Sequence, residues 1–181
     1  TPLYSSAASD VYKRQSMAGR RLKAAKYLAR HLLLSTRDKV AVIAFQEGEV
    51  RVYVPFTRNY YKVEDGLRKI RPFGLTPLAH GLMESHDFIR NSRSKNTLLL
   101  LITDGIPTVP KWTVNPIEDA LTAATHIARA KINFGCIGLQ PSRPYLESLV
   151  REAKGALYVV DELDKEALVR VAYQERRRKG G

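Results

Sequence analysis

The feature that most limits the possible fold is a regular alternation of apolar runs with helix-like segments from residue 16 onward. Runs such as KVAVIAF and TLLLLIT are apolar throughout, as expected for strands covered on both faces. Thr76-Pro77 and Asn115-Pro116 each have the pattern of a helix cap followed by proline in the first turn. Alternating strands and helices build a mainly parallel sheet with helices on both faces. The sequence therefore predicts a doubly wound, Rossmann-like α/β domain.

The individual elements follow from periodicity and turn signals. Val50, Val52 and Val54 alternate with Arg51 and Tyr53, which predicts an antiparallel edge strand with charge on one face. The predicted strands are 39–45, 50–54, 97–103, 132–139 and 156–160, and the predicted helices are 18–35, 60–70, 76–91, 115–131, one ending at 154 and one from about 164.

Length and composition indicate one domain without a membrane anchor. The 181 residues are enough for a single core, and no apolar stretch approaches the roughly 20 residues of a membrane span. The start of the chain lacks the basic-then-apolar order of a signal peptide. The lone cysteine, Cys136, lies in an apolar run and is interpreted as a buried small hydrophobe. We expect a cytoplasmic protein with no membrane partner.

The charge balance leaves a second function class open. Thirty Lys and Arg against eighteen Asp and Glu give a net charge of +12, which favours an anionic partner. A basic nucleic-acid-binding α/β domain is therefore the alternative hypothesis. Against it, the basic residues of helix 18–35 (Arg20, Lys23, Lys26 and Arg30) are interpreted as a solvated face. The basic run 176–179 has no interleaved aromatic residues, so we expect no nucleic-acid partner.

Three residues with hydroxyl or carboxylate oxygens lie where the predicted elements begin or end. Ser16 precedes the first helix, Thr76 opens another, and Asp104 follows the strand 97–103. Hard cations such as Mg²⁺ prefer oxygen ligands, and the carboxyl ends of parallel strands meet at one edge. We expect Ser16, Thr76 and Asp104 to ligate Mg²⁺. Trp112, in the loop after Asp104, is either a contact for a protein partner or a tryptophan that packs its own loop.

These residues resemble the metal-ion-dependent adhesion site of a von Willebrand factor type A domain, which has the pattern Asp-x-Ser-x-Ser, a distant Thr and a distant Asp. Ser16, Thr76 and Asp104 match its second Ser, its Thr and its distant Asp. The segment 77–82, PLAHGL, is similar to the same segment in the D-type subunit of magnesium chelatase. The resemblance implies a non-catalytic assembly subunit. Its Mg²⁺ would bridge to a partner, an AAA+ ATPase subunit that contributes an Asp or Glu as a ligand.

The chain departs from that pattern upstream. Tyr12 and Arg14 stand where the family has its first Asp and first Ser, and a guanidinium repels a cation. We expect Ser16, Thr76 and Asp104 to bind Mg²⁺ in the intact parent protein, and we therefore expect weak or no Mg²⁺ binding by this chain. Residues 10–15, DVYKRQ, are one translation of a DNA-library transposon end, so residues 1–15 are interpreted as an artefactual leader. The native first strand, central in this fold, would be missing or replaced. The domain would span residues 16–173, followed by a basic tail, 174–181.

Common enzyme signatures are missing from the sequence. There is no glycine-rich phosphate loop, and the four histidines lack zinc-ligand spacing, so packing or solvent-facing roles are expected for them. Ser16, His80 and Asp104 could suggest a hydrolase triad, but no Gly-x-Ser-x-Gly turn accompanies them. We expect a binding domain.

Overall fold

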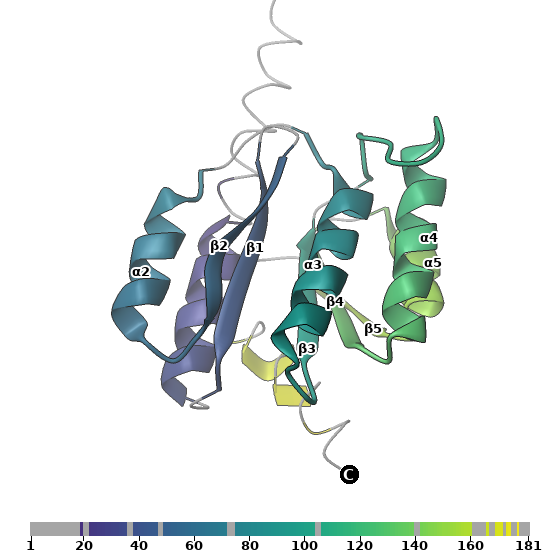
Figure 1. Cartoon of the computed structure of the whole chain (residues 1–181). Coiled ribbons are helices and arrows are strands. Elements are labelled where there is room, and N and C mark those ends of the chain that lie inside the picture. The colour runs from purple at the N-terminus through teal and green to yellow at the C-terminus, as the bar shows by residue number, and fades with distance from the viewer. Residues whose placement is uncertain are drawn as a thin grey trace, which may run out of the picture.

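The computed structural model describes residues 19, 22–35, 38–46, 49–71, 75–103, 106–139 and 142–160, and, near the C-terminus, residues 166, 169–171, 173–174 and 177. A helix over residues 22–35 comes first. The labelled elements of Figure 1 are β1 (Val40–Gln46), β2 (Glu49–Thr57), α2 (Tyr60–Lys69), α3 (Leu78–Ser92), β3 (Leu98–Thr103), α4 (Pro116–Arg129), β4 (Asn133–Leu139), α5 (Arg143–Glu152) and β5 (Ala156–Val160).

The strands form two sheets among the described residues. β3, β4 and β5 are parallel and adjacent in that order, with Leu101 opposite Cys136 and Cys136 opposite Leu157. β1 and β2 form a separate antiparallel pair, as the alternation in β2 predicts. The single continuous sheet expected from the sequence is therefore divided between β1 and β3 in the part of the chain that the structure describes.

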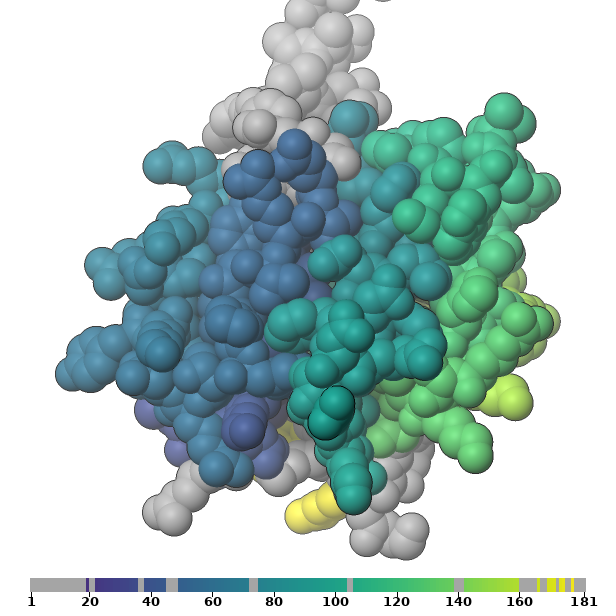
Figure 2. All heavy atoms as spheres, in the orientation of Figure 1, coloured from purple at the N-terminus to yellow at the C-terminus, as the bar shows by residue number. Residues whose placement is uncertain are grey.

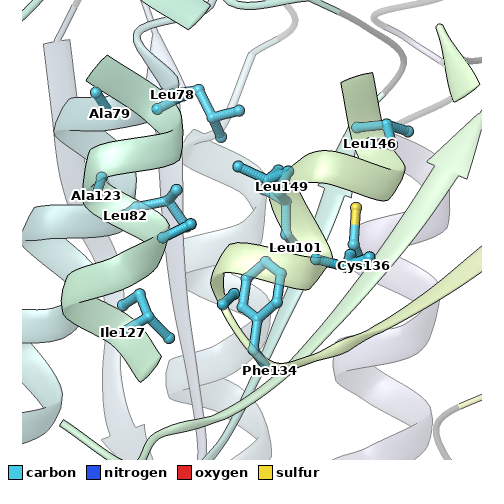
Figure 3. Packing of buried hydrophobic residues seen from close by; sticks show 14 of the residues in the cluster. Leu78, Ala79, Leu82, Leu101, Ala123, Ile127, Phe134, Cys136, Leu146 and Leu149 are labelled. Atoms are coloured by element: carbon cyan, nitrogen blue, oxygen red, sulfur yellow. The ribbon is translucent and has the colours of Figure 1, made fainter. Parts of the chain in front are cut away.

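Helices cover both faces of these strands (Figure 1). The main core lies between β3, β4 and the helices α3, α4 and α5; Figure 3 shows Leu82 and Ile127 pointing toward Leu101 and Phe134. On the other face, the helix over residues 22–35 packs Leu28 near Ile137 of β4 and packs Leu33 against the β1–β2 pair. The predicted doubly wound α/β class is confirmed.

Most predicted elements are present, with one corrected helix start. Asn115 caps α4 as expected, since its side chain accepts a hydrogen bond from the N–H of Ile117 at 3.0 Å. Thr76 does not cap α3: the cap position is Pro77, no side chain caps the helix, and the helix begins at Leu78. Thr76 instead bonds to Thr108, which holds it outside the helix.

Candidate functional site

Two loops meet at the edge of the molecule where β3 ends and α3 begins. The N–H of Thr76 donates to Oγ1 of Thr108 at 2.9 Å, and the N–H of Thr108 donates to the carbonyl oxygen of Thr76 at 3.1 Å. This exchange ties the segment before α3 to the segment after β3. It satisfies both backbone polar groups of Thr76, as buried or half-buried backbone requires.

The side chain of Thr76 remains available for a ligand. Thr76 is half-buried, and its hydroxyl makes no hydrogen bond to any residue that the structure describes. A hydroxyl oxygen in this position suits a hard cation. Ser16 and Asp104, together with Tyr12 and Arg14, lie outside the described residues, although Thr103 and Ile106 on either side of Asp104 are placed. Of the three expected metal ligands, the structure therefore locates Thr76.

The loop over residues 106–115 is held by a carboxylate that the sequence analysis did not single out. Asp119, in the first turn of α4, is 1% exposed and accepts hydrogen bonds from the N–H groups of Lys111, Trp112 and Thr113 at 2.5, 2.9 and 3.0 Å. Burial raises the pKa of this carboxyl, but the hydrogen bonds outweigh burial and lower the pKa to about 2. Asp119 is thus ionised and fixes the path of the loop.

This loop presents Trp112 to solvent. The tryptophan is 48% exposed, the Nζ of Lys111 lies 5.4 Å from its ring centre, and the ring of His126 lies 6.1 Å away. Both interpretations of Trp112 stay open, since the ring lies near His126 of α4 and is about half exposed. In Figure 2 the segment projects at the upper right edge of the molecule.

The histidines near this loop are mostly engaged in packing. His86 is 7% exposed and bonds to Asp87 at 2.8 Å, and the rings of His86 and His126 are 6.4 Å apart. Burial lowers the pKa of His80, Lys111 lowers it further, and Asp119 opposes the shift. The described residues contain no group of three or more His, Cys, Asp or Glu side chains placed to hold a metal.

A groove of about 400 Å³ lies between β2 and α3 and borders the 106–115 loop at Lys111. Its charged and titratable lining residues are Glu49 and Arg51 of β2, His80, Glu84 and Asp87 of α3, and Lys111. The Nδ1 atom of His80 is buried without a hydrogen-bond partner among the described residues. The groove is lined by charges of both signs.

The chain matches an established domain family. Residues 13–106 match the sequence profile of the von Willebrand factor type A (VWA) domain. The chain belongs to this family. VWA domains are typically protein-interaction modules without catalytic activity, so the edge formed by Thr76 and the 106–115 loop is the natural candidate for a binding site.

Similar proteins support the same assignment. An uncharacterized protein from Methanocaldococcus jannaschii is 26% identical over 163 residues, covering 84% of this chain and 93% of that protein. The von Willebrand factor type A structure from Catenulispora acidiphila has a TM-score of 0.67 at 18% identity, covering 88% of this chain and 37% of that one. The vWF domain of the type V pili tip protein Mfa5 from Porphyromonas gingivalis has a TM-score of 0.68 at 11% identity, covering 90% of each chain. The structural matches show a shared fold.

The structure of this VWA domain corrects one expectation about its charge. The sequence predicts a solvated basic face on the first helix. In the structure, Arg30 makes two hydrogen bonds to Glu64 of α2, one of them 3.0 Å long, and Lys26 donates to the carbonyl oxygen of Ile70 at 3.5 Å. These side chains join two helices, because both lie over the β1–β2 pair. Lys23 is exposed as expected.

The structure also bears on Cys136 and on the length of the helices. Cys136 is 0% exposed, and burial raises the pKa of its thiol to about 12, which confirms it as a core residue. Within the described ranges, every helix is too short or too polar to cross a bilayer.

Proposed function

We propose that the VWA domain, when its upstream metal-site residues are intact, binds a protein partner through Mg²⁺, with Ser16, Thr76 and Asp104 among the ligands. The observation that carries the proposal is the position of Thr76, whose backbone is tied to Thr108 while its hydroxyl is left unengaged among the described residues. When bound, the cation would supply a positive charge with an open position for a partner carboxylate. The loop–loop link would hold the Thr76 hydroxyl in place and lower the entropic cost of binding.

Tyr12 and Arg14 limit metal binding in this sequence. An anionic ligand is missing and a cation is added where the family pattern has Asp and Ser. The triple variant Tyr12→Asp, Arg14→Ser, Gln15→Gly restores the pattern and should bind Mg²⁺, whereas the original chain should bind negligibly. Isothermal titration calorimetry of both proteins tests this. Equal affinities would refute the ligand assignment.

We also propose the class of partner. The segment 77–82 resembles that of the D-type subunit of magnesium chelatase, which supports an AAA+ ATPase subunit that contributes an Asp or Glu to the metal. The VWA domain would then act as a non-hydrolysing assembly subunit.

The deciding experiment is capture of the purified ATPase subunit of magnesium chelatase by the triple variant. Capture should require Mg²⁺, disappear in EDTA, and survive moderate salt. Binding to a random-sequence DNA duplex that survives EDTA and falls steeply with log salt would instead support the nucleic-acid alternative.

A further inference from the structure

Large apolar side chains are exposed on the two loops that Thr76 and Thr108 join. Val114 is 96% exposed, Leu75 is 52% exposed, Trp112 is 48% exposed and Ile106 is 47% exposed. Leu75 directly precedes Thr76, and the other three lie in the 106–115 loop. Single exposed hydrophobic residues are common, but four on two hydrogen-bonded loops indicate an interaction surface.

The loop is ordered before any partner binds. The carboxylate of Asp119 accepts from three consecutive backbone N–H groups, and the N–H of Asn115 donates to Oγ1 of Thr113 at 2.9 Å. Asn115 then caps α4. A loop fixed in this way loses little conformational entropy on association, so its exposed side chains contribute more of their contact energy to affinity.

Lys111 contributes an exposed positive charge next to Trp112 on this surface. Lys111 is exposed, its Nζ lies 5.4 Å from the centre of the Trp112 ring, and no acidic side chain among the described residues pairs with it. The neighbouring cation Arg51 is already paired with Glu49 at 2.6 Å. Lys111 is therefore placed to receive a carboxylate from a segment that lies across Trp112.

We propose that Leu75 and the 106–115 loop form a metal-independent docking surface for an apolar and acidic peptide segment of the partner. An apolar side chain of that segment packs on Trp112 and Val114, and a neighbouring Asp or Glu pairs with Lys111. The proposal rests on the proposed function in that the same partner supplies the metal-bridging carboxylate.

A phage-displayed library of random twelve-residue peptides, panned on the full chain in EDTA, provides the probe. Selected peptides should be rich in aromatic or aliphatic residues next to Asp or Glu. Trp112→Ala should weaken their binding by about 30-fold or more, as expected for a central tryptophan contact. Lys111→Gln should weaken binding to acidic peptides but not to their Asn or Gln analogues, as measured by fluorescence anisotropy.

Two variants separate contact from folding. Val114→Ser changes a side chain that packs against almost nothing, so it should reduce peptide affinity without changing the thermal transition. Tyr61→Ala removes an aromatic residue that is 81% exposed on α2, away from the loop, and should leave affinity unchanged.

The outcomes also separate this surface from the metal site. Failure to select peptides, or binding unchanged by both Trp112→Ala and Val114→Ser, would overturn the docking surface while leaving Mg²⁺ capture by the triple variant untouched. Peptide binding in EDTA that depends on Trp112 and Val114, together with partner capture that does not need Mg²⁺, would support the docking surface and contradict the metal bridge.

Discussion

At the scale of single residues, Asp119 shows how one buried carboxylate organises a loop. Three consecutive backbone N–H groups donate to it where the chain turns back toward α4. Its pKa is lowered from 3.8 to about 2. The carboxylate therefore stabilises the folded loop fully above about pH 4, and this stabilisation is lost as the pH falls toward 2.

Acid titration should reveal this loss. Trp112 is the single tryptophan of the chain, so its fluorescence reports on the loop directly. We expect a change in its emission and acrylamide quenching between about pH 4 and pH 2. In Asp119→Asn, quenching should already be high at pH 7 with no acid transition. Asp65→Asn, which alters an exposed acid on α2, is the control; the same acid transition in Asp119→Asn would contradict the assignment.

Metal ligation at Thr76 and Asp104 is also a residue-scale question. In the triple variant, Asp104→Ala removes a carboxylate ligand, so Mg²⁺ affinity should fall sharply and partner capture should vanish. Thr76→Ala should lower Mg²⁺ affinity less than Asp104→Ala does, because water can replace one neutral hydroxyl. Thr76→Ser should retain most of the Mg²⁺ affinity. Calorimetry with Mg²⁺ measures all three. Mg²⁺-dependent capture that survives Asp104→Ala would require abandoning the metal bridge.

At the scale of elements, α2 lies unusually close to β2. A Cβ atom added to Gly66 would meet a side-chain methyl of Val54 and would lie 2.5 Å from the carbonyl oxygen of Tyr53. Glycine within a helix normally lowers stability relative to alanine. At Gly66 the close approach to backbone reverses that preference, because the strand cannot move aside cheaply.

Gly66→Ala should therefore destabilise the domain by about 1–3 kcal/mol, as overpacking does. Gly19→Ala is the matched control: residue 19 is helical and has nothing within 4 Å of the added atom. That change should be neutral or stabilising, by up to about 1 kcal/mol. Urea unfolding followed by circular dichroism measures both. A Gly66→Ala protein as stable as Gly19→Ala would show that α2 does not pack this closely.

The elements are largely predictable from the sequence, and the loop geometry is not. The apolar run LLLLIT forms β3, and Asn115 caps α4, because periodicity and capping are local properties. Thr76 carries a local helix-start signal, but its bond to Thr108, 32 residues away, holds it outside α3. Asp119 has the sequence pattern of an ordinary acid in a first turn, since only the folded loop brings residues 111–113 to it.

At the scale of the whole molecule, the main feature is the division between β1 and β3. Within the described residues, each of these strands pairs on one side only. Leu98, Leu99 and Leu100 are half-buried, although such an apolar strand is expected to be covered completely. Leu32 of the first helix packs against both sheets, and α3 contacts β1 as well as the core around Leu101. Helices therefore join the two sheets on both faces.

This arrangement predicts that an apolar strand would stabilise the domain. The family resemblance implies a central first strand, whereas residues 6–11, SAASDV, are poor in apolar and β-branched residues. Placing six Val and Ile residues at positions 6–11 should let a strand pair with β1 and β3. Burying roughly 200 Å² of apolar surface at about 25 cal/mol per Å² would add about 5 kcal/mol to the free energy of unfolding.

Urea unfolding and amide exchange test this strand. The urea m-value should rise together with the free energy of unfolding, because more surface is exposed on unfolding. Amide exchange of β3 should slow, because its unpaired edge would gain a hydrogen-bonded neighbour. Six Ala residues at the same positions provide the control, since alanine favours helix over strand. Equal stability and equal β3 exchange in the two variants would show that β1 and β3 do not accept a strand between them.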